Sequence, residues 1–276
     1  MTRYEPNAIL AHRIEAAPGL GIFRIAPDGW RLPQFAPGQY AVIGLPASAP
    51  RTPLSDPEER KNGNGNGGPD RLIRRAYSIA SSSLAREYLE LFVNLVRSGE
   101  FTPRLFALEP GDRLWLGKKF TGMFTLRDVP PEAHVVLVAT GTGLAPYMSM
   151  LRTELQCGGP RKFAVLHGAR HSWDLGYTAE LFTMQRICPN FTYVPIVSRP
   201  GEEPAPWGGA RGHVQDLWRL GALERAWGFE PTLRNTHVFL CGNPAMIEDM
   251  TRLLQGEDFR VHEPRAPGQI HVERYW

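Results

Sequence analysis

The stretch HVVLVATGTGLAP (134–146) decides the fold of this chain. Its first seven residues form a continuous apolar run, which is typical of a strand buried on both faces of a parallel sheet. A glycine-containing turn follows, and residues 145–156 have helical spacing. Small residues between a strand and a helix let the backbone approach phosphate groups, so the turn is a candidate phosphate site; the alternative is an ordinary tight turn.

The same strand–helix alternation continues to the C-terminus, which predicts a doubly wound parallel sheet. The predicted strands are 134–140, 163–169, 191–198 and 237–241, and the predicted helices are 145–156, 180–187, 213–220 and 244–255. Pro130 and Pro131 mark the start of this region. We therefore expect a nucleotide-binding α/β domain over residues 128–276.

Upstream, the apolar runs are short, often alternating, and separated by Gly and Pro turns. They predict six strands, at 7–15, 20–26, 39–45, 75–80, 88–96 and 112–116. Residues 101–110 are predicted as the one helical interruption. This pattern favours a six-stranded antiparallel β-barrel over residues 1–127.

Residues 46–70 break both patterns, because they are rich in Pro, Gly and Asn and almost free of large apolar side chains. We expect a mobile loop without packed structure, inserted between two barrel strands. A tolerated surface insertion is the plainer interpretation, and a loop that gates or contacts a partner is the alternative.

Composition excludes several classes of protein. The chain has 276 residues, of which 42% are hydrophobic and 21% charged, values typical of ordinary globular domains. No apolar run approaches the length of about 18 residues that a membrane span needs, and the N-terminus does not resemble a signal peptide, so a cytoplasmic location is expected. Three scattered Cys argue against a disulfide framework and against an iron–sulfur cluster, and no metal site is predicted.

Charge differs between the two halves. Residues 1–127 carry 17 basic and 12 acidic residues, whereas residues 128–276 carry 14 and 16. The total of +3 is too small to argue for nucleic acid as a partner.

A second turn, Cys241-Gly242-Asn243-Pro244, also ends a strand and begins a helix. Ligands of doubly wound sheets lie across the carboxyl ends of the strands, so two such turns together make a plausible floor for a dinucleotide. Cys241 is expected to point into that cleft; the alternative is a small core residue at a strand end.

A third motif, Arg75-Ala76-Tyr77-Ser78, lies on a predicted barrel strand. Strand alternation places Arg75 and Tyr77 on one face, where a guanidinium and a flat ring can meet a phosphate and an aromatic cofactor. An ordinary edge-strand pattern is the alternative for this motif taken alone.

These motifs, in this order and spacing, resemble the ferredoxin–NADP reductase family, in particular its bacterial ferredoxin or flavodoxin reductase branch. The resemblance rests on R-A-Y-S, G-T-G-L-A-P and C-G-N-P-x-M, and on the aromatic end at Tyr275 and Trp276. It covers nearly the whole chain. The chain departs from the family in the long 46–70 insertion and in Ala145, at a place often held by Gly.

The resemblance implies FAD in the barrel and NADP(H) in the sheet domain. Arg75 would pair with the FAD pyrophosphate, Tyr77 would stack on the isoalloxazine, and Ser78 would hydrogen-bond near its N5. The strand Phe92–Val96 would line the ribityl chain, and a loop and helix start at Thr102 would receive the pyrophosphate. The full expected FAD set is Arg75, Ala76, Tyr77, Ser78, Phe92, Asn94, Leu95, Val96, Gly99, Phe101, Thr102, Thr142, Tyr275 and Trp276.

For the nucleotide, the resemblance implies that Thr142 and Gly143 approach the nicotinamide side. Arginines near the strand ends could grip a 2′-phosphate, and no acidic residue stands within Ser198-Arg199-Pro200, so NADPH is favoured over NADH. The full expected set is Thr142, Gly143, Arg170, Ser198, Arg199, Arg211, Cys241, Gly242, Asn243, Pro244 and Asp249. Because the chain has 27 Arg and only four Lys, any one of these arginines is weak support.

The implied reaction is hydride transfer between nicotinamide C4 and flavin N5, with Ser78, Cys241 and Tyr77 as the catalytic candidates. Tyr275 and Trp276 would return to cover the flavin and act as a gate. The expected partner is an acidic ferredoxin or flavodoxin, and Arg71, Arg74, Lys118 and Lys119 are candidates for steering it. We expect a monomer that binds neither nucleic acid nor a membrane.

Two other functions remain open at this point. The first is a reductase component that serves an oxygenase or free flavin. The second is a flavoprotein that binds FAD and a protein partner as a sensor or assembly subunit without turnover. The two intact glycine turns argue against the second, because such a protein would not need a nicotinamide site.

Overall fold

The computed structural model describes residues 5–58 and 71–274. The chain divides into two compact units, Met1–Thr125 and Leu126–Trp276. The boundary expected from sequence, between residues 127 and 128, lies two residues further along the chain. Among the residues that the structure describes, no helix has the length and apolar character to cross a membrane.

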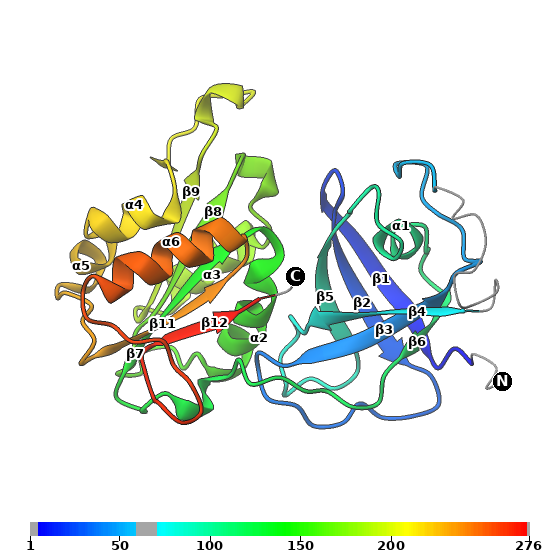
Figure 1. Cartoon of the computed structure of the whole chain (residues 1–276), viewed down its shortest axis with the longest axis horizontal. Coiled ribbons are helices and arrows are strands. Elements are labelled where there is room, and N and C mark those ends of the chain that lie inside the picture. The colour runs from blue at the N-terminus through cyan, green and yellow to red at the C-terminus, as the bar shows by residue number, and fades with distance from the viewer. Residues whose placement is uncertain (1–4, 59–70, 275–276) are drawn as a thin grey trace. The chain divides into compact units, whose positions relative to one another are not determined.

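The first unit is an antiparallel barrel, as the sequence predicts (Figure 1). Its strands are β1 (Ala8–Ala17), β2 (Leu20–Pro27), β3 (Tyr40–Pro46), β4 (Leu72–Ser78), β5 (Leu89–Asn94) and β6 (Arg113–Leu116), in the order β4-β3-β6-β1-β2-β5. Just past the end of β4, Ile79 bridges Leu91 of β5, and the Ala80 N–H donates to the Glu90 carbonyl at 2.7 Å. These contacts join the two outer strands and close the barrel.

Alternating side chains fill this barrel. Leu10, Phe23, Ile43 and Leu91 come from four different strands and are fully buried in one apolar cluster. Burial of this kind stabilises a domain by about 25 cal/mol per Å² of apolar surface removed from water. The barrel is therefore a packed scaffold that can fix the positions of residues on its outer strand β4.

The helical interruption predicted at 101–110 is much shorter in the structure. Only α1 (Thr102–Leu105) is helical, and Pro103 stands in its first turn. After it, the chain continues in separate turns, with the Ala107 N–H bonded to the Arg104 carbonyl. A single turn is enough here because Phe101, Leu105 and Phe106 already reach the barrel core.

The expectation of an unpacked insertion is wrong for its first half. Thr52 is 7% exposed, and its N–H donates to the Pro103 carbonyl at 2.8 Å. The Arg51 side chain donates to the carbonyls of Gly99 and Asp56, each at 3.0 Å. Polar side chains can anchor a loop that lacks apolar residues, which composition alone does not reveal. Residues 59–70 lie outside the described part of the chain.

The second unit is a six-stranded, all-parallel sheet with helices on both faces, which confirms the predicted doubly wound fold. Its strands are β7 (His134–Thr140), β8 (Phe163–Ala169), β9 (Phe191–Val197), β10 (Ala210–Arg211), β11 (Thr236–Cys241) and β12 (Ile270–Glu273), in the order β10-β9-β8-β7-β11-β12.

The helices of this unit are α2 (Ala145–Glu154), α3 (Thr178–Ile187), α4 (Val214–Arg219), α5 (Ala222–Trp227) and α6 (Pro244–Gln255). Short 3₁₀ turns lie at η1 (Leu126–Asp128), η2 (Gly141–Leu144), η3 (Ser172–Asp174) and η4 (Pro200–Glu202). In Figure 1, α4, α5 and α6 lie over one face of the sheet, and α2 and α3 lie behind it. Val136, Leu166 and Leu240 of the sheet pack with Leu217 and Met250 of the first group of helices.

The sequence argument missed β10, α5 and β12. The first has only two residues, α5 has six, and β12 contains His271 and Glu273 among its four. Elements this short lack the periodicity by which helices and strands are recognised. They are held by tertiary context, since β12 pairs along β11 and β10 pairs with β9.

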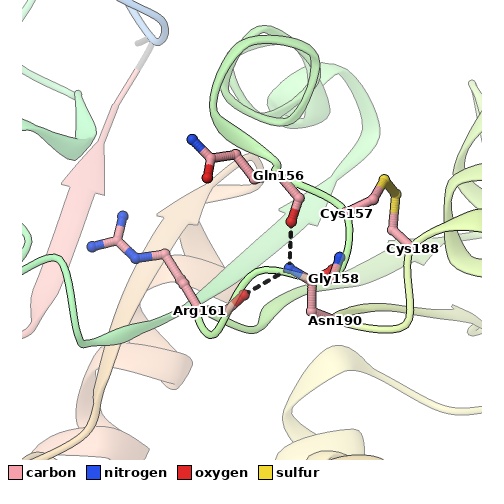
Figure 2. Close-up of a disulfide and its surroundings, with 6 residues drawn as sticks. All are labelled: Gln156, Cys157, Gly158, Arg161, Cys188 and Asn190. Carbon is pink, nitrogen blue, oxygen red and sulfur yellow. Dashed lines mark hydrogen bonds between the residues drawn. A yellow bond between two sulfur atoms is a disulfide. The ribbon is translucent and has the colours of Figure 1, made fainter.

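The structure contains one disulfide, although three scattered cysteines argue against a disulfide framework. Cys157 and Cys188 form a disulfide, with their Cα atoms 4.4 Å apart (Figure 2). The Asn190 side chain supports the same loop, because its amide donates to the carbonyls of Gln156 and Arg161, each at 2.9 Å. The two cysteines follow α2 and α3, whose C-terminal ends lead into adjacent strands β8 and β9. Parallel packing therefore brings them together despite 31 residues of separation.

Candidate functional site

The two predicted glycine turns follow adjacent strands at the point where the strand order reverses. From β7 the chain proceeds to β8 on one side, whereas β11 lies on the other side of β7. In doubly wound sheets, ligands bind outside the carboxyl ends of the strands at this point. The turn after β7 and the turn after β11 are therefore where a dinucleotide is expected.

Gly143 fits directly against the second turn. A β-carbon on Gly143 would lie 2.3 Å from the Cys241 carbonyl oxygen and 2.7 Å from the Gly242 nitrogen. No real side chain tolerates such distances, so only glycine lets the two turns approach this closely. The two turns that the sequence assigns to one site are therefore in direct contact.

The second turn is equally constrained. Gly242 has a φ of +135°, and a β-carbon there would lie 2.3 Å from Thr140 Oγ1. Thr140 Oγ1 accepts a hydrogen bond from the Asn243 N–H at 2.7 Å. The Asn243 side chain in turn caps α6, accepting from the N–H of Ala245 at 2.9 Å. Pro244 begins the helix, where its missing N–H costs nothing.

Thr142 is half-buried at the start of η2, whereas Cys241 is completely buried. The thiol of Cys241 thus lies in the interior of the sheet domain, the position of a small core residue. Its carbonyl is the group that faces Gly143.

Three predicted arginines lie at the ends of three neighbouring strands. Arg170 directly follows β8, Arg199 lies two residues after the end of β9, and Arg211 is the last residue of β10. Because parallel strands meet one edge of a sheet with their carboxyl ends, all three belong to the same edge as the glycine turns. The Arg199 N–H donates to the Arg170 carbonyl at 2.9 Å, and the Ser198 N–H donates to the Ala169 carbonyl at 3.0 Å.

Carboxylates lie close to these arginines, a feature that the sequence argument did not weigh. The Arg199 guanidinium is 3.6 Å from Glu202, and Glu202 also lies 2.8 Å from His171 Nε2. This contact raises the pKa of His171 and lowers the pKa of Glu202. Glu203 accepts hydrogen bonds from the N–H and the hydroxyl of Ser172. Both carboxylates are therefore engaged within the chain.

Asp249 occupies the second turn of α6, outside the glycine turns. Its carboxylate is 3.4 Å from the Arg252 guanidinium and accepts from Gln215 Nε2 at 3.5 Å. The structure thus pairs Asp249 with neighbours on α6 and α4.

In the barrel, the R-A-Y-S motif lies on β4 as predicted. Tyr77 is half-buried, packs against the apolar core, and places its ring centroid 6.0 Å from that of Phe101. Burial raises the pKa of the Tyr77 hydroxyl, so the ring is neutral at ordinary pH. Ser78 is 5% exposed at the end of the strand, whereas Ala76, two residues earlier, is exposed.

Arg75 reaches the loop that precedes α1. Its Nη2 is 3.6 Å from Glu100 Oε2, and the Arg71 guanidinium pairs with Glu100 Oε1. Two guanidinium groups thus meet one carboxylate. This donor set suits an anionic group such as a pyrophosphate.

The remaining predicted FAD residues fall into two groups. Phe92, Phe101 and Thr102 are buried and support the site from the core, whereas Asn94 and Val96 are exposed and Leu95 is half-buried. Gly99 forms a tight turn, since a β-carbon there would lie 3.0 Å from the Val96 carbonyl oxygen. Tyr275 and Trp276 lie outside the described residues.

Arg104 is a residue of this region that sequence reasoning missed. It is 4% exposed, and it donates from Nε and Nη2 to the Ala47 carbonyl and from Nη1 to the Glu100 carbonyl. Its bidentate pair with Glu58, at 2.8 and 3.1 Å, lowers the pKa of that carboxyl. One signal was available, because an arginine within the apolar stretch F-T-P-R-L-F must find partners if it is buried.

Comparison with known proteins agrees with this arrangement. Residues 137–252 match the family model described as the oxidoreductase NAD-binding domain. The chain is 32% identical to a ferredoxin–NADP reductase of Azotobacter vinelandii over 87% of its own length and 86% of that protein. It is also 32% identical to the flavodoxin/ferredoxin–NADP reductase of Escherichia coli (strain K12), covering 86% and 93%.

The fold has a solved counterpart of the same extent. A ferredoxin NADP⁺ reductase from Neisseria gonorrhoeae, solved with bound FAD and NADP, superposes over the whole of both chains with a TM-score of 0.76 at 24% identity. With the two glycine turns interlocked, the R-A-Y-S motif on the outer barrel strand, and relatives above 30% identity over most of their length, the chain belongs to the ferredoxin/flavodoxin–NADP reductase family.

Proposed function

We propose that this protein is an FAD-dependent oxidoreductase that moves electrons between NADP(H) and a one-electron carrier, ferredoxin or flavodoxin. The observation that carries the proposal is the fit of Gly143 against Cys241 and Gly242 at the reversal point of the sheet. A turn packed this tightly presents backbone to a ligand with no side chain in the way. Family membership gives the reaction class.

When bound, FAD supplies the chemistry by which a hydride from the nicotinamide becomes two single electrons for the carrier. The residues of this chain bind and orient the two cofactors, and they exclude water from the reacting atoms. Tyr77 offers a neutral ring, fixed against Phe101, on which a flat heterocycle can stack. The Ser78 hydroxyl, at the end of β4, would form a hydrogen bond near the reactive N5 of the flavin ring.

On the nucleotide side, Thr142 and Gly143 would approach the nicotinamide and its ribose. Cys241 is a small, fully buried residue at the end of β11, and its carbonyl lies against Gly143 where the two turns meet. We assign Tyr77, Ser78 and Cys241 to the immediate surroundings of the reaction, Cys241 through its backbone, because its thiol is buried. Cys241→Ala keeps a small side chain there and should therefore leave the affinity for NADPH unchanged.

A preference for NADPH over NADH is part of the proposal. Arg170, Arg199 and Arg211 offer guanidinium groups at adjacent strand ends, and Arg binds a phosphate through paired N–H groups. The carboxylates that could bind a free 2′-hydroxyl, Glu202 and Glu203, are engaged with His171 and Ser172. Arg199→Gln should raise the KM for NADPH and leave that for NADH unchanged.

We also propose that the carrier is acidic and is steered by basic residues of the barrel. Arg74 lies over the indole ring of Trp115 at 4.7 Å, and Lys118 lies over that of Trp30 at 5.4 Å. Lys119, next to Lys118 in sequence, is exposed. Steering by such groups weakens as salt screens the charges. Carrier reduction that does not slow as salt rises would contradict this part of the proposal.

A monomeric state and a cytoplasmic location complete the proposal. Size-exclusion chromatography with light scattering tests the first, and cell fractionation tests the second.

Tyr275 and Trp276 are proposed to gate the flavin. Removal of both should change the NADPH affinity or the hydride-transfer rate, and unchanged values of both would refute the gate.

The experiment that tests the whole function uses purified holoenzyme. The protein should carry FAD, be reduced by NADPH without oxygen, and then reduce ferredoxin or flavodoxin. Reduction by NADPH together with transfer only to an oxygenase or to free flavin would identify the rival reductase function. A flavin that no nicotinamide nucleotide reduces would identify a protein without turnover.

A further inference from the structure

Two arginines of the barrel converge on one carboxylate. Arg71 lies directly before β4 and Arg75 lies within it, and each pairs with a different oxygen of Glu100. Glu100 belongs to the loop that precedes α1. The side chains are 39%, 52% and 34% exposed, so water and ions from solvent can reach the cluster.

The buried side chain of Arg104 holds the backbone near both Arg71 and Glu100. The Ala47 N–H donates to the Arg71 carbonyl at 2.8 Å, which extends the β3–β4 ladder beyond the end of the strands. Arg104 binds the Ala47 carbonyl through Nε and Nη2, and it binds the Glu100 carbonyl through Nη1 at 2.7 Å. Arg71 and Glu100 therefore meet because their main chains are fixed at this separation.

A carboxylate that bridges two guanidinium groups resembles a phosphate in charge and geometry. Both present two oxygens to planar N–H forks. Without Glu100 the two arginines carry two positive charges, which match the two negative charges of a pyrophosphate diester.

The loop offers few other donors for such an anion. The α1 helix is one turn long and contains Pro103, which has no N–H. The Thr102 hydroxyl is already used, because it donates to the Val96 carbonyl at 3.2 Å and accepts from the Val96 N–H at 2.9 Å. Binding of an anion here must therefore depend on the guanidinium groups.

We propose that Arg71 is a second ligand of the FAD pyrophosphate, beside Arg75, and that Glu100 is an internal competitor that occupies both guanidinium groups until the cofactor binds. This inference rests on the proposed FAD site at Arg75 and deepens it. FAD binding exchanges one anion for another at the same two arginines. The affinity for FAD is then lower than the arginines alone would give.

The test measures FAD binding and release directly with the full chain. FAD affinity is determined by flavin fluorescence on titration of the deflavinated protein, and its release rate is followed after dilution of the holoenzyme. The variants are Glu100→Gln, Arg71→Gln and the double variant. Glu109→Gln and Arg74→Gln are matched controls, because Glu109 pairs with Arg13 and Arg74 lies over Trp115, away from Glu100.

Glu100→Gln should tighten FAD binding about tenfold, and Arg71→Gln should weaken it about tenfold, with each control within twofold of wild type. Inorganic pyrophosphate serves as a probe that has no flavin. It should bind the deflavinated Glu100→Gln variant more tightly than wild type, and adding Arg71→Gln should remove this gain. A purely structural role of Glu100 would not produce that coupling.

The inference is overturned if Glu100→Gln leaves FAD affinity unchanged or weakens it, or if Arg71→Gln has no larger effect than Arg74→Gln. Circular dichroism and thermal unfolding establish that the variants are folded before they are compared. The proposed function is tested separately, by FAD binding and NADPH reduction in the wild-type protein. If wild type passes both and the variants behave as the controls do, only the competition is wrong.

Discussion

The hydroxyl oxygen of Thr140, at the end of β7, accepts a hydrogen bond from the backbone N–H of Asn243, at the start of α6, at 2.7 Å. This bond joins two turns that are about a hundred residues apart in sequence. Replacing Thr140 with Val keeps the shape and removes the acceptor. We expect a loss of about 1–2 kcal/mol in the free energy of unfolding and a higher KM for NADPH.

Thr140→Ser is the matched control, because it keeps the oxygen and loses only the methyl group. Urea unfolding and steady-state kinetics of both variants check the expectation. Equal behaviour of the two variants would show that the hydroxyl does not hold the turns together.

Gly143→Ala should damage the nucleotide site more severely. The new methyl group would lie 2.3 Å from the Cys241 carbonyl oxygen, so the two turns must separate. Overpacking of this kind typically costs about 1–3 kcal/mol, and we expect the KM for NADPH to rise about tenfold. FAD content should not change, since the barrel is a separate unit. Gly208→Ala is the control, because a β-carbon there meets open space.

The cysteine pair should stabilise the sheet domain without affecting catalysis. The bond closes a loop of 31 residues, for which the loop-entropy relation gives about 3.7 kcal/mol. Cys157 and Cys188 precede β8 and β9, at the amino ends of the strands, whereas the glycine turns are at the carboxyl ends. Treatment with a phosphine reductant should lower the Tm and leave the KM for NADPH unchanged. An unaltered Tm would contradict this prediction.

Stability should fall in mild acid because three imidazoles, two of them buried and one partly buried, stay neutral in the native state. Burial lowers the pKa of His167 to about 3, that of His271 to about 3 and that of His237 to about 4. His237 Nδ1 and His271 Nε2 are 3.0 Å apart, and His262 stacks on His271 with ring centroids 4.5 Å apart. An imidazolium formed on His237 or His271 would therefore lie next to other imidazoles of this cluster.

Acid lowers the free energy of unfolding because the unfolded chain binds more protons than the native protein. In the unfolded chain these groups bind protons below about pH 6.5, while the native groups do not until pH falls much further. Stability is thus full above about pH 6.5 and is lost as pH drops toward 4, by at most about 1.4 kcal/mol per pH unit for each group. Thermal unfolding at a series of pH values measures this slope. His237→Gln should flatten the slope, and the exposed His12→Gln should not.

Much of the fold could be predicted from sequence because its elements have strong periodic signals. The strand at 163–169 and the helix at 244–255 were predicted with the bounds that the structure gives. The first is a continuous apolar run, and the second begins at an Asn-Pro cap. The contact between the glycine turns could also be expected, since both follow strands of one parallel sheet.

Other features depend on contacts that no local pattern encodes. The anchoring of residues 46–58 by Arg51 and Arg104 is an example, because polar loops with buried arginine partners have the composition of unpacked loops. The pairing of Arg71 and Arg75 with Glu100 is another, since it depends on how the loop before α1 lies against β4. The disulfide is a third, because it requires the arrangement of two helices.

The central claim is that this chain transfers electrons from NADPH through FAD to a small carrier. The most direct measurement mixes the purified holoenzyme with NADPH, and separately with NADH, in the absence of oxygen, and follows flavin absorbance in a stopped-flow instrument. We predict rapid bleaching by NADPH, slower bleaching by NADH, and recovery of the absorbance when oxidised ferredoxin or flavodoxin is added. Purified protein without flavin, or a flavin that NADPH leaves oxidised, would contradict the account.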